Sequence, residues 1–393
     1  MPLPPPIRVA EFGSFAYHTI TERLPDLCHR VIAENDFSQA IEANLRALAA
    51  EMPEGKIIPI ADHAIDVAAW HTYLQPYLNR CWLDLPWYFS EAYFYRRVLV
   101  AIDYFQTGID PYRLQKRLGL DHAIDAIQAL SQQCDRIQGT WDRANFVALL
   151  YTALWGNRVD LSLFPAQPGR HYAIQTIHDQ DNLLVDQAEQ ISDWIAATSG
   201  RLDFIIDNAG FELSCDLCLA DYLLTSQRVE QIRFHTKSHP IFVSDAMPKD
   251  VVGTIAHLEA LQPNIEPSLQ SLLCRLKAHI AGNRLQIQHH SFWTSPLLFE
   301  EMPADLREEL GQATLVLVKG DANYRRLLGD RHWDFTTPFE QIVSYFPTAV
   351  AALRTLKSEI ACGLTPDQID RLTATDPDWL INGKRGVIQL LRS

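Results

Sequence analysis

The first part of the chain carries apolar residues at helical spacing. Segments such as 36–52 and 120–137 place apolar side chains three or four residues apart, which is the period of an amphipathic helix. No convincing strand pattern occurs between residues 15 and 165. We therefore expect residues 1–165 to form an all-helical domain.

The pattern changes after a stretch rich in glycine and proline at residues 156–169, where we place the domain boundary. Residues 181–200 are expected to form a helix that is capped by Asp181 or Asn182 and ended by Gly200. Short β-rich runs then alternate with amphipathic helical segments. The expected strands cover residues 202–207, 231–236, 240–245, 285–290 and 314–319.

Strands joined by helical crossovers favour a mostly parallel sheet that is covered on both faces. The sequence thus predicts an α/β fold for residues 166–393, a three-layer α/β/α sandwich with a Rossmann-like sheet. In such sheets, ligands bind outside the carboxyl ends of the strands. We expect the catalytic site of this second domain at that edge.

Polar residues follow three of the expected strands. Asp207 and Asn208 end the first, Asp245 ends another, and Lys319 and Asp321 end the last. Two carboxylates and an amide are hard oxygen ligands, which suit Mg²⁺ or Mn²⁺. A lysine beside the amides of a helix start suits a phosphate. An aspartate in such a place can also be only a helix cap.

Composition narrows the class of protein. The chain has 393 residues, 47% of them hydrophobic and 21% charged, as in ordinary globular proteins. A net charge of −14 argues against nucleic-acid binding. The seven cysteines lack disulfide-like spacing, and neither a leader segment nor a bilayer-length apolar run occurs. We expect a cytoplasmic protein without a membrane partner, and the sequence leaves its oligomeric state open.

Several motifs resemble those of the metal-dependent damage-control phosphatases, a family also known for its acidic-residue methyltransferase-like group. The motifs are DNAGFE at 207–212, FVSD at 242–245, and KGDANYRRLLGD at 319–330. PWYFSEAYFYRRVL at 86–99 and LWGNRVDLSL at 154–163 resemble the family's N-terminal signatures. RTLK, at 354–357, matches the Arg-Thr-x-Lys signature of the third subfamily.

The resemblance implies roles for individual residues. Asp207, Asn208 and Asp245 are expected to bind the metal and to carry the catalytic site. The family's substrate-phosphate pocket corresponds to the run from 321 to 325 and to Lys357. The substrate-binding residues that we expect, besides those three, are Glu212, Lys319, Asp321, Ala322, Asn323, Tyr324, Arg325, Arg354, Lys357, Glu91 and Arg96.

The implied function is a metal-dependent phosphatase for small sugar phosphates, such as fructose 1-phosphate and fructose 6-phosphate, that removes damaging metabolites. The metal would be Mn²⁺ or Mg²⁺, with Co²⁺ or Ni²⁺ as alternatives. We favour attack on phosphorus by a metal-activated water over attack by Asp207. Residue 209 is alanine, so the second aspartate of haloacid-dehalogenase-type phosphatases is absent. Asp321 and Glu212 are both candidates for the general acid.

Two other functions stay open at this point. One family activity is S-adenosylmethionine-dependent carboxyl methylation of glutamate, which would make that cofactor a ligand. The glycine-rich loop usual in Rossmann methyltransferases does not occur in the chain, which argues against this function. The other alternative is a sugar-phosphate sensor that binds its ligand without turnover and without metal.

Overall fold

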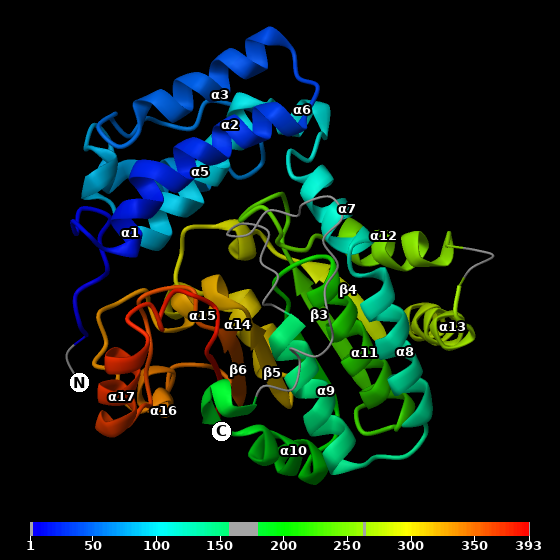
Figure 1. The fold of residues 1–393 in the computed structure, drawn as a ribbon. Coiled ribbons are helices and arrows are strands. Elements are labelled where there is room, and N and C mark those ends of the chain that lie inside the picture. Colours follow the sequence, from blue (N-terminus) through cyan, green and yellow to red (C-terminus); the bar gives the residue numbers. More distant parts are fainter. Residues whose placement is uncertain (1–2, 157–179, 262–264, 393) are drawn as a thin grey trace.

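The structure is a computed structural model that describes residues 3–156, 180–261 and 265–392. Its described strands form one sheet in the order β1-β7-β6-β5-β2-β3-β4 (Figure 1). All neighbouring strands are parallel except β6 and β7. The strands are β1 (Leu183–Asp186), β2 (Arg201–Ile205), β3 (Gln231–Thr236), β4 (Leu285–His289), β5 (Leu315–Lys319), β6 (Val350–Thr355) and β7 (Gly386–Leu391).

Helices cover both faces of this sheet. One face packs in a core with helices α8 (Ile124–Arg136), α9 (Arg143–Trp155), α10 (Ala188–Ala197), α11 (Phe211–Thr225), α12 (Pro248–Glu259) and α13 (Pro267–Ala281). The other face packs with α14 (Ala304–Gly311), α15 (Asp321–Leu327) and α16 (Phe339–Ile342). Helix α17 (Pro366–Thr375) lies beyond that layer (Figure 1). The predicted three-layer α/β/α fold with a mostly parallel sheet is confirmed.

The earlier helices lie mainly above the carboxyl edge of the sheet (Figure 1). They are α1 (Phe15–His18), α2 (Leu24–Glu34), α3 (Gln39–Glu51), α4 (Val67–Leu74), α5 (Trp87–Ala101), α6 (Tyr104–Thr107) and α7 (Arg113–Asp121). The predicted boundary at 156–169 falls almost wholly outside the described residues, so the two-domain division stays a prediction. Helices α8 and α9 precede that boundary and yet share a core with the sheet.

Two expected elements differ from the observed ones. The predicted helix over 181–200 begins only at Ala188, because the apolar run before it pairs with β7 as the strand β1. Asp186 then accepts a hydrogen bond from the Ala188 amide. Residues 240–245 do not form a strand, because the backbone turns at Phe242 and Val243, whose φ angles are +48° and +66°.

The sheet order creates a crevice between β2 and β5. The chain leaves β2 toward β3 and β4 on one side, while β5 leads to β6 on the other. Such a reversal of strand order opens a ligand-binding crevice at the carboxyl ends of the strands. Asp207 follows β2 and Asp321 follows β5, so both lie at this reversal.

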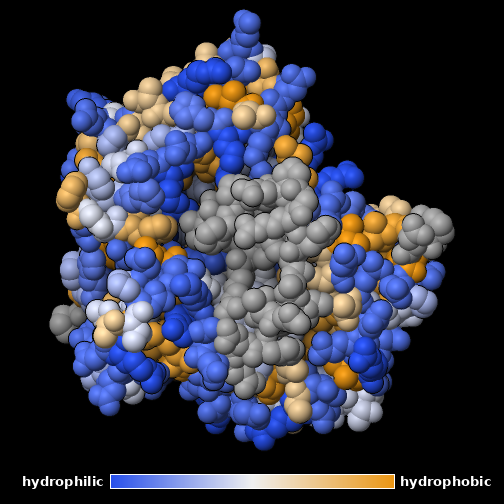
Figure 2. Space-filling view, in the orientation of Figure 1, coloured by the Kyte–Doolittle hydropathy of each residue, from blue (hydrophilic) through white to orange (hydrophobic). Residues whose placement is uncertain are grey.

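The face shown in Figure 2 is mostly hydrophilic, with hydrophobic residues in small patches. Among the helices of the described residues, none combines the length and the apolar character that crossing a bilayer requires.

Lys319 does not face the crevice. The prediction that Lys319 contacts the substrate phosphate is therefore wrong. Its Nζ donates to Glu212 Oε1 at 2.9 Å, to Asp216 Oδ1 at 2.8 Å, and to the Ala153 carbonyl at 2.8 Å. All three charged side chains are buried. Burial raises the pKa of Asp216 to about 7, although Lys319 acts to lower it. This charge cluster ties β5 to α11 and α9 under the crevice.

Removing this lysine should destabilise the fold rather than weaken substrate binding. We expect Lys319→Met to lower the free energy of unfolding by about 3–5 kcal/mol, because two buried acidic groups lose their partner. Chemical denaturation measures the change, and Lys384→Met, at an exposed lysine, is the matched control. A Lys319→Met protein of normal stability with only a raised KM would contradict this account. It would assign the lysine to the substrate pocket.

Candidate active site

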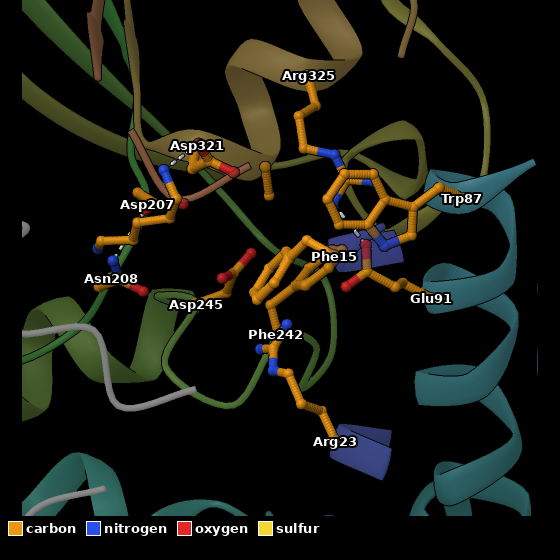
Figure 3. A pocket seen from close by; sticks show the side chains of 12 residues that line it. Phe15, Arg23, Trp87, Glu91, Asp207, Asn208, Phe242, Asp245, Asp321 and Arg325 are labelled. Atoms are coloured by element: carbon orange, nitrogen blue, oxygen red, sulfur yellow. Dashed lines mark hydrogen bonds and ion pairs between the residues drawn. The ribbon is translucent and has the colours of Figure 1, made fainter. Parts of the chain in front are cut away.

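A small cavity of about 50 Å³ lies at the crevice between β2 and β5. Figure 3 shows Asp207, Asn208 and Asp245 on one side of it and Glu91, Trp87 and Arg325 on the other. The residues that line it come from the helices above the sheet and from loops at its carboxyl edge: Phe15, Arg23, Trp87, Glu91, Asp207, Asn208, Phe242, Asp245, Asp321, Ala322, Arg325 and Lys357.

Backbone pairing brings the two aspartate segments together. The Ala209 amide donates to the Ser244 carbonyl at 2.7 Å, and the Ala246 amide donates to the Asp207 carbonyl at 2.8 Å. Asn208 and Asp245 thus form an isolated antiparallel bridge. The turn at Phe242 and Val243 makes this bridge possible, so Asp245 reaches the site from a loop and not from a strand end.

The amide of Asn208 is fixed by its neighbours. Its Nδ2 donates to Asp207 Oδ2 and to Glu212 Oε2, both at 2.8 Å, while its Oδ1 accepts from Ser244 Oγ. Glu212 is itself bound to Lys319. A chain of contacts therefore runs from the buried lysine through Glu212 to the side chain of Asn208.

Asp207, Asn208 and Asp245 all line the cavity. Two carboxylates and one amide oxygen are a donor set that suits a hard divalent cation. The described residues hold no group of three His, Cys, Asp or Glu side chains arranged around a metal position. The candidate set is thus the mixed one of Asp207, Asn208 and Asp245.

Lys237 is a buried neighbour of this set that sequence reasoning missed. Its Nζ lies 3.2 Å from Asp245 Oδ2 and donates to Asn323 Oδ1 at 3.0 Å. Burial lowers the pKa of Lys237, while Asp245 acts to raise it. The lysine stands just after β3, and its position beside Asp245 depends on the turn at 242–243, which the sequence pattern did not indicate.

Gly320 allows Asp207 to lie against the start of α15. Its φ is +86°, and a Cβ added there would come within 2.0 Å of Asp207 Oδ2. Any side chain at this position would both strain the backbone and displace the carboxylate. The KGD motif thus contains a glycine that the site requires, between a buried lysine and a cavity aspartate.

Asp321 is held by residues of the 354–357 motif. Its Oδ1 accepts from Arg354 Nε at 2.7 Å, from the Lys357 amide at 3.0 Å, and from Ser358 Oγ at 3.0 Å. Arg354 also donates to the carbonyls of Ser358 and Ile360, and it does not line the cavity. Its predicted direct contact with substrate is therefore corrected to a positioning contact with Asp321.

Glu91 and Arg325 form a buried pair at the opposite wall. Arg325 Nη1 donates to Glu91 Oε2 at 2.6 Å, its Nε donates to Asp330, and its guanidinium lies 3.5 Å from the centre of the Trp87 ring. Burial raises the pKa of Glu91, although Arg325 acts to lower it. Glu91 thus reaches the cavity from the helical part, as the sequence predicted.

Other predicted residues lie away from the cavity. Arg96 donates to Asp62 and Asp66 and does not reach the site. Asn323 bonds the Lys319 carbonyl, and the Tyr324 hydroxyl bonds Gln389. Like Glu212 and Lys319, Asn323 and Tyr324 do not line the cavity. They support the residues that do. Ala322 and Lys357 do line it.

The cavity also contains residues that the sequence reasoning did not select. Arg23 ends a single π-helical turn, Thr19–Arg23, and such turns often occur at functional sites. Phe15 and Phe242 lie between the two walls (Figure 3). Phe15 and Arg23 belong to no expected strand end or polar cluster, so the pattern of the chain held no signal for them, whereas Phe242 belongs to the FVSD motif that was selected for Asp245.

Comparison with known proteins identifies the family of the chain. A profile of the damage-control phosphatase ARMT1-like domain matches residues 17–372. The damage-control phosphatase ARMT1 of Rattus norvegicus is 34% identical, over 96% of this chain and 96% of that protein. The Homo sapiens protein of the same name is 32% identical, again over 96% of each.

A structural comparison gives a more distant likeness. A DUF89 family protein from Pyrococcus horikoshii matches with a TM-score of 0.47 and 13% identity, over 87% of this chain and 92% of that one. The sequence comparisons extend over nearly the whole chain and include every residue of the cavity except Phe15 within the matched profile. The chain belongs to the damage-control phosphatase ARMT1-like family and is thereby a phosphatase, a phosphoric monoester hydrolase.

Proposed function

We propose that the protein hydrolyses small sugar phosphates, of the fructose 1-phosphate or fructose 6-phosphate type, with a divalent cation held by Asp207, Asn208 and Asp245. The observation that carries this proposal is the composition of one cavity, where these oxygen donors stand beside three cationic side chains, Arg23, Arg325 and Lys357. Oxygen ligands and cations together match a cation and a phosphate dianion.

When bound, Mn²⁺ or Mg²⁺, or alternatively Co²⁺ or Ni²⁺, would neutralise phosphoryl charge and lower the pKa of a water. Asp207 and Asp245 would orient the reacting groups, and we favour water over Asp207 as the nucleophile. Arg23, Arg325 and Lys357 would bind the phosphoryl oxygens as charge develops on them. Glu91 and Asp330 bind the Arg325 guanidinium, Asp321 accepts from the backbone amide of Lys357, and Arg23 Nη1 donates to Thr19 Oγ1.

Glu91 is our proposed proton donor for the leaving oxygen. It lines the cavity, and burial raises its pKa, so it can hold a proton at a higher pH than an ordinary glutamate. The two candidates from the sequence are less suitable. Glu212 is bound to Lys319 outside the cavity, and Asp321 Oδ1 is already engaged by Arg354, the Lys357 amide and Ser358 Oγ.

The aromatic residues of the cavity would contact the sugar. The cavity volume of about 50 Å³ is well below that of typical small-molecule sites. We therefore expect the site to open when a sugar phosphate binds. We also place the enzyme in the cytoplasm, because all seven cysteines are free.

The first test is release of inorganic phosphate from fructose 1-phosphate with added Mn²⁺, Mg²⁺ or Co²⁺. We expect turnover that a chelator abolishes, and a loss of at least about 100-fold in Asp207→Asn, since a neutral amide binds a cation less well than a carboxylate. Asp125→Asn, at an exposed aspartate of α8, is the matched control.

The same preparations should be checked by thermal unfolding and by Mn²⁺ titration. Asp207→Asn should stay folded and lose affinity for Mn²⁺. Full activity in the presence of chelator, or an active Asp207→Asn enzyme, would contradict the proposed cation site. Methyl transfer from S-adenosylmethionine without phosphate release would favour the methyltransferase alternative, which no feature of the cavity supports at present.

A second prediction concerns Lys357. Lys357→Ala should raise KM for fructose 1-phosphate about 10- to 100-fold with a smaller change in kcat, because a charge-assisted contact of about 1.5–3 kcal/mol to the phosphate is lost. Steady-state kinetics measures both constants. Lys384→Ala, which removes an exposed lysine, is the control. A fall in kcat at unchanged KM would instead assign Lys357 to the transition state.

A further inference from the structure

A second cavity of about 310 Å³ lies behind the turn that carries Asp207 and Asn208. The two residues that follow them, Ala209 and Gly210, line this second cavity, whereas Asp207 and Asn208 line the first. Its other walls come from Asp110, from α7 and from α12 as far as His257. Its volume falls at the lower end of the range for small-molecule sites.

Basic side chains converge on this second cavity in an otherwise acidic protein. Arg113, Lys116 and Arg117 reach it from α7, and Lys249 reaches it from α12. Two acidic residues, Asp110 and Asp250, also line it. The lining thus carries more positive than negative charge, while the whole chain carries −14. A concave region of opposite sign concentrates anions from solution.

The cations of this cavity differ in how far they are already neutralised. Lys116 is buried and lies 2.7 Å from Asp250 and 3.4 Å from Asp110, and Lys249 lies 2.9 Å from Asp110. Arg117 lies 3.6 Å from Asp121. Arg113 is exposed, and among the described residues it has no hydrogen-bonded or ion-paired side-chain partner. A ligand anion would therefore meet Arg113 first, with the paired lysines behind it.

We propose that this second cavity is a binding site for a small phosphorylated metabolite that acts as an effector of the active site. An arginine without a partner, next to further basic groups, suits a phosphate that carries two charges. The apolar wall at Leu120 and the free volume leave room for the remainder of a small molecule.

The position of the second cavity would let a bound effector act on the active site. Ala209 and Gly210 directly follow Asp207 and Asn208, and Lys249 and Asp250 follow Asp245 in the first turn of α12. Asp250 also accepts a hydrogen bond from the Met247 amide. A ligand held between α7 and α12 thus contacts both segments that bring Asp207 and Asp245 together.

The chain offers a substitution that fills this cavity without disturbing the packing. Gly253 lies within α12, lines the cavity, and has no heavy atom within 4 Å of the position of an added Cβ. Gly253→Leu should therefore block the site. Gly253→Ala controls for the loss of the backbone flexibility of glycine. Arg113→Glu reverses the exposed charge, and Arg371→Glu does the same on α17, at a distance from α7 and α12 (Figure 1).

The experiment is equilibrium dialysis of pyrophosphate with the full chain and chelator present, for the wild type and all four variants. We expect the wild type, Gly253→Ala and Arg371→Glu to bind alike, and Gly253→Leu and Arg113→Glu to bind at least tenfold more weakly or one equivalent fewer. Circular dichroism checks that each variant is folded. Equal binding by all five proteins, or an equal loss in Arg371→Glu and Arg113→Glu, would overturn the proposed site.

Hydrogen–deuterium exchange tests whether bound pyrophosphate stabilises the turn that follows Asp207 and Asn208 and the start of α12. With pyrophosphate and chelator, amides of 209–210 and 249–253 should exchange more slowly in the wild type but not in Gly253→Leu. Slower exchange that persists in Gly253→Leu would place the pyrophosphate elsewhere, and unchanged exchange in the wild type would contradict an effector role. Neither result depends on hydrolysis, so failure here is distinct from failure of the proposed phosphatase reaction.

Discussion

The buried contact of Lys319 with Glu212 and Asp216 is the interaction on which the site depends. The lysine ends the central strand β5, and both acidic groups belong to α11, the helix that follows β2. A buried cation with two acidic partners costs much to disrupt, because each group would be left without compensation. Through Glu212 the same cluster orients Asn208. The buried charges beneath the cavity therefore determine its geometry.

The cavity itself is assembled from parts of the chain that are far apart in sequence. The crevice between β2 and β5 supplies Asp207 and Asp321, a turned loop supplies Asp245, and the helices above supply Glu91 and Arg23. Cationic side chains and carboxylates thus line the same small cavity. The second cavity lies behind the same turn, which is why we connect its occupancy with the chemistry.

The sequence predicted β2, β3, β4 and β5 and the polar residues that follow β2 and β5, because hydrophobic period and strand-end chemistry are local features, but it did not predict β1, β6 or β7. It could not distinguish Lys319, which points into the core, from Lys357, which lines the cavity, because both follow apolar strands. Arg354 was misassigned for the same reason, since its partner Asp321 lies on another element. Lys237 and Arg23 became visible only in three dimensions, because turns and helix packing bring them to the site.

The central claim is that Asp207, Asn208 and Asp245 together bind one divalent cation beside the phosphate-binding cations. The most direct measurement is anomalous X-ray scattering at the manganese edge from crystals of the protein grown with Mn²⁺. The account predicts a single strong peak within coordination distance of side-chain oxygens of all three residues. A peak at another place, or none at a Mn²⁺ concentration that supports full activity, would contradict it.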